Sequence, residues 1–260
     1  MAALLTLDLG NTNASLAHRA GDASVVLLAS GASDDLGWLE AALREAPEAE
    51  RAALSAVGGR AAEAEGAELL GRIAAVHVRP DAGLTMAIRN PETCGTDRQY
   101  AMRAALEDAR AAGASRALVV DAGTALTVDA GEWRAEAPVF RGGAIALGPG
   151  SAADALARAG ARLPDVELQP DAPALGRSTP EALTAGVVVG FRGAVRELCR
   201  EIGREAFGGT RGVRAYLTGG ARAFADPVFD DLGLGAPAVD PLLVHRGLAL
   251  ALGPKPGPAG

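Results

Sequence analysis

Cysteine is nearly absent from this chain, since only Cys94 and Cys199 occur among its 260 residues. Two thiols so far apart provide neither a disulfide framework nor the paired spacing of a metal site. We interpret both as buried or idle thiols and expect a reducing compartment. Aromatic residues are also scarce, at 3%, whereas Ala, Gly and Arg are abundant, a bias that is typical of a high-GC genome.

The chain also lacks an excess of positive charge. It has 25 Lys and Arg residues against 32 Asp and Glu residues, which gives a net charge of -7, and no basic cluster overrides this balance. The composition therefore argues against general nucleic-acid binding. An enzyme that acts on a small anion is still compatible with it, because such a site needs only a few local cations and a metal.

Long apolar runs are missing as well. No uncharged apolar stretch reaches the roughly 18 residues of a membrane span. The start of the chain lacks the charged and apolar regions of a signal peptide. We therefore expect a cytoplasmic protein with neither a membrane nor a nucleic-acid partner.

The length and the hydrophobic content favour two domains. A chain of 260 residues that is 49% hydrophobic can bury two cores. We expect an N-terminal domain over residues 1–114, a C-terminal domain over 115–253 and a flexible Pro/Gly-rich tail over 254–260.

One small pattern occurs twice, once in each half of the chain. Residues 7–13 read Leu-Asp-Leu-Gly-Asn-Thr-Asn, and residues 120–127 read Val-Asp-Ala-Gly-Thr-Ala-Leu-Thr. Each copy follows an apolar run that predicts a buried strand. Glycine lets a phosphate approach the backbone, and the carboxylate can hold a hydrated cation beside it. One copy would also fit an ordinary hairpin, but two indicate a duplicated fold with a nucleotide between its halves.

The order of predicted elements supports the duplication. Three short strands precede alternating helices and strands, the order of a ribonuclease-H-like domain of actin-like and sugar-kinase ATPases. We predict an α/β fold of two such domains with a nucleotide cleft between them. The predicted strands are 3–9, 14–18, 24–28, 52–57, 73–78, 116–121, 125–129, 142–147 and 214–218. The predicted helices are 34–44, 61–72, 97–112, 151–161 (after a Gly-Pro-Gly stop at 148–150), 179–207 and 241–252.

A loop rich in helix breakers, residues 90–96, ends on Asp97 and Arg98 at the start of a predicted helix. An aspartate at that place is commonly a helix cap. Beside two phosphate loops, however, Arg98 could bind a carboxylate through paired hydrogen bonds, and Asp97 could accept the proton of a substrate hydroxyl. An ordinary aspartate pKa of about 4 would already make Asp97 a ready acceptor.

These segments together resemble the type III pantothenate kinase family over about residues 3–250. Each motif alone is weak, but their combination, order and spacing are specific. Two further segments, 179–186 and 218–221, resemble that family's Thr-x-x-Ala-Leu-x-x-Gly and nucleotide-side Thr-Gly-Gly. The other matching motifs are Asp8-x-Gly10-Asn11-Thr12, Gly95-Thr96-Asp97-Arg98, Asp121-x-Gly123-Thr124-Ala125-x-Thr127-x-Asp129 and Gly142-Gly143-Ala144-Ile145.

The resemblance implies two actin-like domains, a homodimer, and transfer of phosphate from ATP to pantothenate to give 4'-phosphopantothenate, the first step of coenzyme A synthesis. It also implies Mg²⁺ near Asp8, a monovalent cation (K⁺ or NH₄⁺) held by Asp121, and Asp97 as the base. The residues implied to bind ATP are Asp8, Leu9, Gly10, Asn11, Thr12, Asn13, Ala14, Ser15 and Thr124. Those implied to bind pantothenate are Gly95, Thr96, Asp97, Arg98 and Thr179, the last in the neighbouring subunit's site.

One departure from the family concerns the substrate. The family usually carries a tyrosine in the pantothenate pocket, seven residues before the Gly of Gly-x-Asp-Arg, where this chain has Ile88. Two alternatives therefore stay open: a kinase of another small hydroxy acid, and a non-catalytic nucleotide-binding regulator of the same family. Retention of the acidic and basic site residues argues against the regulator.

Four other polar residues have no assigned chemistry. His18, His77 and His245 are scattered, and we interpret them as surface residues or satisfied core residues. Asp129 fits a ligand of the second loop and the end of a strand equally well.

Overall fold

The structure is a computed structural model that describes residues 3–19, 24–160 and 163–253. The chain divides into two compact units. The first takes in Met1–Glu107 and Leu242–Gly260, as far as these are described, and the second is Asp108–Pro241. The predicted tail 254–260 and the predicted end of the helix 151–161 lie outside the described residues.

The first unit is built on a sheet with the strand order β3-β2-β1-β4-β5. Its central strand, β1, is antiparallel to β2 and parallel to β4. Alternate residues of β1, namely Leu5, Leu7 and Leu9, point to one face and form a core there. The strands are β1 (Leu4–Leu9), β2 (Asn13–Arg19), β3 (Val25–Ala32), β4 (Arg51–Ala56) and β5 (Ala75–Val78).

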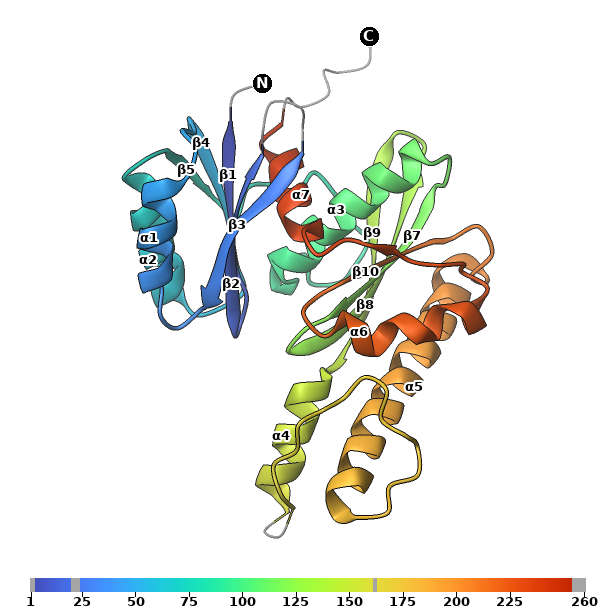
Figure 1. Cartoon of the computed structure of the whole chain (residues 1–260). Coiled ribbons are helices and arrows are strands. Elements are labelled where there is room, and N and C mark those ends of the chain that lie inside the picture. The colour runs from blue at the N-terminus through green and yellow to red at the C-terminus, as the bar shows by residue number, and fades with distance from the viewer. Residues whose placement is uncertain (1–2, 20–23, 161–162, 254–260) are drawn as a thin grey trace. The chain divides into compact units, whose positions relative to one another are not determined.

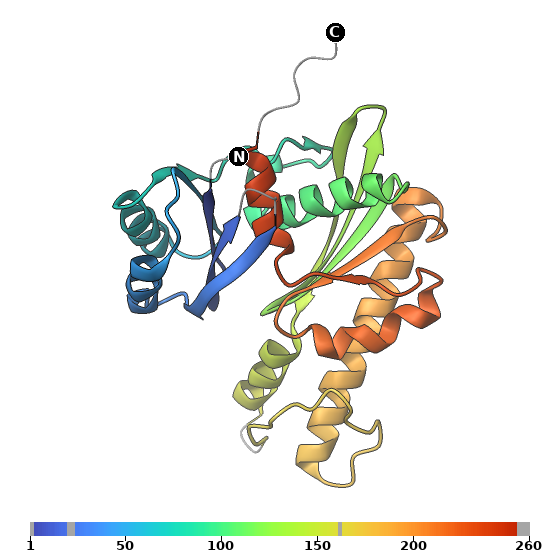
Figure 2. The ribbon, with the colours of Figure 1, turned by 45° about the horizontal axis from the view of Figure 1, so that its top comes forward.

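Helices cover both faces of this sheet. The leucine face packs against α1 (Gly37–Glu45) and α2 (Arg60–Gly71), which lie side by side in Figures 1 and 2. The other face is covered by α7 (Leu243–Ala251), the last helix of the chain (Figure 1). Between β5 and α3 (Thr96–Ala111) lie the short strand β6 (Thr85–Met86) and the 3-10 helix η1 (Pro91–Thr93).

The second unit repeats this arrangement. Its own five strands have the order β9-β8-β7-β10-β11. Its central strand, β7, is antiparallel to β8 and parallel to β10. If the strands of each unit are numbered along the chain, both units have the strand order 3-2-1-4-5. This shared order confirms the predicted duplicated α/β fold. The strands are β7 (Arg116–Ala122), β8 (Ala125–Arg134), β9 (Ala137–Leu147), β10 (Arg214–Thr218) and β11 (Ala238–Val239).

The long helix α5 (Thr179–Phe207) provides most of the second core. Its residues Phe191, Val195 and Cys199 are buried against the apolar face of β7 and β8. Burial raises the pKa of the Cys199 thiol to about 12, as expected for an idle buried cysteine. The first part of α5 extends past the sheet beside α4 (Pro149–Ala159), as Figure 1 shows. The short helices α6 (Arg222–Ala225) and η2 (Asp226–Leu232) follow β10.

Several predicted boundaries differ from the structure. Three strands are longer than predicted, because their pairing continues along the neighbouring strand: β3 ends at Ala32, β8 ends at Arg134 and β9 begins at Ala137. The expected stop at 148–150 is wrong, because α4 begins at Pro149, where the missing N–H of proline costs no hydrogen bond. The helix predicted from residue 34 begins at Gly37, whose amide donates to Asp35 Oδ1 at 3.0 Å. The strand predicted from residue 73 begins at Ala75, after an exposed turn at Ile73.

The predicted domain bounds also differ from the two compact units. The units divide after Glu107 rather than after residue 114, and α7 belongs to the first unit rather than to the C-terminal domain. The physical reason is that α7 buries His245 and Leu248 against the first sheet. None of the helices in the described parts of the chain has the length and apolar character needed to cross a bilayer.

The crossing of α7 over α3 should depend on Gly247. A Cβ atom there would lie 2.0 Å from the carbonyl oxygen of Tyr100, which is backbone and cannot move aside cheaply. We expect Gly247→Ala to lower the free energy of unfolding by about 1–3 kcal/mol, the usual cost of overpacking. The matched control is Gly71→Ala in α2, where a Cβ atom would meet only Val76 Cγ2 at 3.9 Å. Urea unfolding compares the two; equal stabilities would contradict the close crossing.

Candidate active site

Asp8, near the end of β1, lies between two hydroxyl side chains. In the ladder it is opposite Ser15 of antiparallel β2 and opposite Ser55 of parallel β4. Residues at the same level of a sheet point to the same face. Since Leu7 and Leu9 point into the core, all three polar side chains lie on the other face.

The turn after Asp8 is closed by the backbone. The Gly10 amide donates to the Asn13 carbonyl at 3.0 Å, and a Cβ atom on Gly10 would lie 2.8 Å from the same oxygen. Asn11, Thr12 and Asn13 are exposed and so can offer donors to an anion. Of the residues predicted to bind ATP, Leu9 and Ala14 have buried side chains in the core, which leaves only their backbone for a ligand.

The segment 95–98 is hydrogen-bonded to the same end of the first sheet. Thr96 Oγ1 lies 3.2 Å from Ser55 Oγ, so a hydrogen bond joins the start of α3 to the neighbour of Asp8. Gly95 leaves room for the carboxylate of Asp97, because a Cβ atom there would lie 2.5 Å from Asp97 Oδ1. The structure thus brings Asp8, Ser15 and this predicted substrate segment together within the first unit.

Asp97 is a partly buried carboxylate in the first turn of α3. Burial raises its pKa above the ordinary value, while a hydrogen bond from the Arg98 amide to Oδ1 (2.8 Å) and the Arg98 charge act in the opposite direction. The pKa of Asp97 is therefore higher than the ordinary value, which from the sequence was already expected to be sufficient for a proton acceptor. A raised pKa makes its carboxylate a stronger proton acceptor than an exposed aspartate.

The second unit builds the same motif around Asp121. Asp121 is opposite Thr127 of antiparallel β8 and opposite Thr218 of parallel β10. Each unit therefore places one carboxylate on its central strand between two hydroxyls, one from each neighbouring strand. This pairing supports the expectation that the two Asp-x-Gly loops are copies of one device.

Glycines pack the Asp121 loop against its surroundings. Gly219 has φ +91°, and a Cβ atom there would lie 2.5 Å from Asp121 Oδ1. Gly148, the N-cap of α4, approaches Gly123 so closely that a Cβ atom would lie 2.0 Å from its carbonyl oxygen. Ser151 Oγ donates to the Thr124 carbonyl at 2.7 Å, and the Thr124 side chain is exposed.

Two other predicted residues lie apart from this loop. Thr179 is the exposed first residue of α5, roughly 18 Å along the helix from Phe191, where packing on the sheet begins. The structure does not bring it to the Asp121 loop. Asp129 is buried in the middle of β8, next to Gly143, whose missing side chain leaves space for the Asp129 carboxylate. Asp129 is therefore not at a strand end.

Sequence reasoning missed Ser55 and the role of His245. Ser55 follows the apolar residues Ala52, Ala53 and Leu54 in a strand that carries no motif. His245 is 2% exposed and lies 2.8 Å from both Thr6 Oγ1 and Ser15 Oγ, at separations of more than 200 residues. It is a satisfied core histidine, as predicted, but its partner Ser15 belongs to the site. No local signal could reveal that contact.

Tyr100 does not replace the tyrosine that is missing at Ile88. It is buried, and its hydroxyl donates to the Pro80 carbonyl at 2.6 Å. Its role is to hold the segment before β6 on α3, together with Arg103, which donates to the carbonyl of Gly83 at 3.1 Å. Ile88 itself is half-buried and presents no hydrogen-bonding group.

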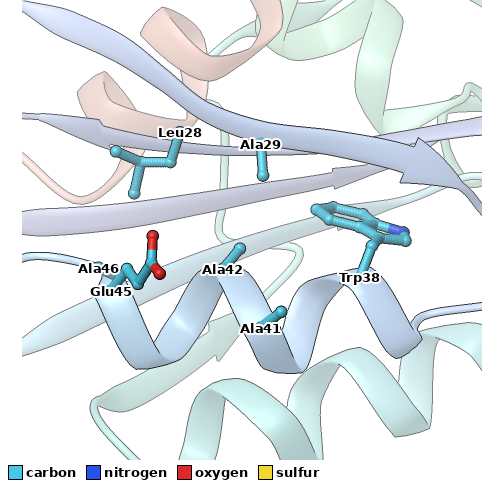
Figure 3. A pocket seen from close by; sticks show the side chains of 7 residues that line it. All are labelled: Leu28, Ala29, Trp38, Ala41, Ala42, Glu45 and Ala46. Atoms are coloured by element: carbon cyan, nitrogen blue, oxygen red, sulfur yellow. The ribbon is translucent and has the colours of Figure 1, made fainter.

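A cavity of about 370 Å³ between β3 and α1 lies apart from these groups. Figure 3 shows Leu28, Ala29 and Trp38 around it, with Glu45 as the one charged residue of its lining. Such a lining offers an anion no positive charge and few donors. The chemistry of the two Asp loops therefore indicates the site better than this cavity does.

The oxygen atoms around both aspartates are suitable ligands for hard cations. Carboxylate and hydroxyl oxygens are the ligands that Mg²⁺ and K⁺ prefer, and Mg²⁺ usually takes one or two carboxylates together with water and phosphate oxygens. Asp8 with its flanking hydroxyls could hold hydrated Mg²⁺. Asp121 with Thr127 and Thr218 offers a similar oxygen set to a second cation.

Replacing Asp97 with Asn should raise stability at neutral pH. Because the pKa of Asp97 is higher in the folded chain, the folded state binds that proton more tightly than the unfolded state does. This stabilisation is complete below the unfolded pKa of about 4 and is lost as the pH rises through the folded pKa. Asp97→Asn should therefore have a higher Tm than the wild type at pH 7, with a smaller difference at lower pH.

Thermal unfolding at pH 7 and at pH 4.5, followed by circular dichroism, measures both differences. Glu92→Gln is the matched control, because it removes an exposed carboxylate from the same loop and should leave Tm unchanged. An Asn variant that is no more stable than the wild type at pH 7 would show that the buried charge carries no cost.

Comparisons with solved structures identify the fold. A provisionally assigned 2-dehydro-3-deoxygalactonokinase from Sinorhizobium meliloti superposes with a TM-score of 0.57 at 16% identity, over 98% of both chains. The archaeal actin homologue Ta0583, in complex with ADP, superposes with a TM-score of 0.51 at 12% identity, over 96% of this chain and 97% of that one. At these identities the likeness shows the two-domain actin-like fold alone.

Sequence comparisons identify the family. A type III pantothenate kinase of Thermus thermophilus is 42% identical over 139 residues, and this match spans only 53% of each chain. The type III pantothenate kinase of Parafrankia is 36% identical over 214 residues, which span 78% of this chain and 81% of the relative. The family profile for type III pantothenate kinase matches residues 4–201. The chain belongs to the type III pantothenate kinase family.

Proposed function

We propose that this chain transfers the γ-phosphate of ATP to the primary hydroxyl of pantothenate and releases ADP and 4'-phosphopantothenate. The observation that carries the proposal is the position of Asp97. Asp97 is partly buried and follows directly after Thr96, which is hydrogen-bonded to Ser55 beside Asp8. The proposed proton acceptor and the proposed cation-binding carboxylate are thereby held at one end of the first sheet. Phosphoryl transfer requires such positioning.

In the proposed step Asp97 takes the proton of the substrate hydroxyl while that oxygen bonds to the γ-phosphorus. The bond from the γ-phosphorus to the β,γ-bridging oxygen breaks, and ADP leaves with the electron pair. Burial supports this role, because the raised pKa of Asp97 improves proton transfer near neutral pH.

Pantothenate carries a carboxylate, which Arg98 would bind in a charge-assisted pair. The partly exposed backbone at Gly95 and the Thr96 hydroxyl would contact the same substrate. Thr179 would serve the site of a second subunit, since it lies apart from the Asp121 loop of its own unit. These roles follow from the family motifs and from the positions of the residues in each unit.

The nucleotide would be bound by the two Asp loops. Asn11, Thr12, Asn13 and Thr124 would donate to phosphate oxygens from exposed positions. Asp8 would hold Mg²⁺ through its carboxylate, and Asp121 would help to hold a monovalent cation. When bound, Mg²⁺ would neutralise charge on the phosphates.

Asp97→Asn should lower kcat by about 10²- to 10⁴-fold, the usual contribution of a general base. ADP release by the purified protein, measured in Mg-ATP and potassium with and without pantothenate, tests both the reaction and the base. Glu92→Gln, in the same loop, is the control and should keep the wild-type rate. A near-normal rate in Asp97→Asn would remove Asp97 as the base.

The same assay separates the alternatives. Ile88 presents no hydroxyl where the family usually has a tyrosine, so a second candidate is a kinase of another small hydroxy acid. Nucleotide binding without stimulation by pantothenate, but with stimulation by another hydroxy acid, would favour that candidate. Nucleotide binding with no stimulation by any of them would favour a non-catalytic regulator.

Arg98→Ala should raise the pantothenate KM by about 10- to 100-fold, because a hydrogen bond to a charged group is worth roughly 1.5–3 kcal/mol. The KM for ATP should change little. Arg44→Ala, which removes an exposed arginine from α1, is the control. An unchanged pantothenate KM would exclude Arg98 from carboxylate binding.

We also propose a homodimer formed through the part of α4 and α5 that extends past the second sheet. Exposed apolar side chains gather on this part of the unit, which includes Leu156 (40% exposed), Val189 (42%) and, in the connecting segment, Leu175 (75%). Apolar surface of this kind is typical of a protein interface.

Val189→Glu should therefore convert a dimer to a monomer in light scattering after size-exclusion chromatography. A charge buried without a partner in an interface is strongly unfavourable. Val26→Glu, at a comparably exposed position of β3 (52%), should leave the dimer intact. A wild-type monomer, or a dimer that persists in Val189→Glu, would contradict this interface.

A further inference from the structure

His245 joins the last helix of the chain to the β1–β2 hairpin. Its ring is 2% exposed, with Nδ1 2.8 Å from Thr6 Oγ1 and Nε2 2.8 Å from Ser15 Oγ. Thr6 and Ser15 lie on the polar face of the first sheet, and Ser15 is opposite Asp8 in the ladder. Both ring nitrogens are thus used, one of them on a neighbour of the candidate cation-binding carboxylate.

The hydrogen bonds of Thr6 determine which ring nitrogen carries the proton. Thr6 Oγ1 also lies 3.4 Å from the Ala17 carbonyl, which can only accept. Thr6 has one hydroxyl hydrogen, and giving it to Ala17 leaves the Thr6 oxygen to accept from His245 Nδ1–H. In the opposite arrangement, the Thr6 hydroxyl would donate to His245 Nδ1 and could not donate to the Ala17 carbonyl.

A neutral imidazole has a single N–H, so Nε2 then has only a lone pair. It accepts the hydroxyl hydrogen of Ser15. In a neutral ring these hydrogen bonds therefore place the single N–H on Nδ1.

We propose that His245 is a positioning residue. Its Nε2 accepts a hydrogen bond from the Ser15 hydroxyl, so the Ser15 oxygen beside Asp8 can act only as an acceptor toward a ligand. This inference rests on the proposed function only in the identity of the ligand. A carboxylate and an acceptor hydroxyl side by side repel phosphate oxygens but suit the water molecules of a hydrated Mg²⁺, which donate. Ser15 would thus contribute to cation binding, not to direct phosphate binding.

The tautomer can be tested without any ligand. Long-range ¹H–¹⁵N correlation spectra of the labelled full chain distinguish the two nitrogens of each of the three histidines. The His245 signals are assigned by their shift in Ser15→Ala. The inference predicts a neutral ring at pH 7 with its proton on Nδ1. A ring protonated on Nε2, or on both nitrogens, would overturn it.

The effect on cation binding is tested by calorimetric titration of ADP with and without Mg²⁺. His245→Leu removes the acceptor, and we expect the enhancement of affinity by Mg²⁺ to fall about 3- to 10-fold, the worth of one hydrogen bond. His245→Gln retains an acceptor and should keep most of the enhancement. Ser15→Ala should show the same loss, and the double variant with His245→Leu should lose no more.

Tyr100→Phe is the matched control, because it removes another buried hydroxyl bond of the same unit and should leave the Mg²⁺ effect unchanged. Losses that are equal with and without Mg²⁺, or that add in the double variant, would overturn the positioning role. Because neither experiment requires pantothenate or turnover, failure here is distinct from failure of the proposed kinase reaction.

Discussion

In each unit, the register of three neighbouring strands fixes the position of one carboxylate. This is Asp8 in the first unit and Asp121 in the second. In the first unit, alternate leucines of β1 are buried, so a slip of one residue would move Leu5, Leu7 and Leu9 to the polar face and Asp8 into the core. The same alternation holds β7, where Leu118, Val120 and Ala122 are buried and Asp121 is not. The apolar core of each sheet therefore determines the position of its polar site.

The hydroxyls beside Asp8 are held by helices from two distant parts of the chain. Thr96 of α3 bonds to Ser55, and His245 of α7 bonds to Ser15. Because α3 also carries Asp97 and Arg98, the bond from Thr96 links the proposed base to the strand next to Asp8. These hydrogen bonds hold the hydroxyls on either side of Asp8, whereas the turn after β1 is exposed.

This arrangement places the proposed function of Asp97 in opposition to the stability of the fold. Burial of the carboxylate raises its pKa, which improves a proton acceptor but costs folding free energy whenever the group is charged. Gly95 is part of the same compromise, because only a residue without a side chain leaves room for the Asp97 carboxylate.

Much of the fold could be predicted from local pattern. The bounds of α5 and β10 agree with the sequence prediction, since a long apolar periodicity and an apolar run between breakers mark them. The two Asp loops could be found because the pattern occurs twice. Pro149 was misread because proline both ends helices and starts them.

The contacts that complete the site could not be predicted in this way. Ser55 and His245 carry no motif, and their roles arise from strand pairing and from the packing of α7 on the first unit. Nothing in the sequence of α7 indicates which unit it joins. The short strand β11 is set by its pairing with β10 and has no periodicity of its own.

The most direct test of this account is the affinity of Asp8→Asn for ADP, measured by calorimetry with and without Mg²⁺. If Asp8 is the cation-binding carboxylate, affinity without Mg²⁺ should be close to that of the wild type, and most of the gain that Mg²⁺ provides should be lost. An Asp8→Asn variant that keeps the full gain from Mg²⁺ would contradict the central place given to Asp8.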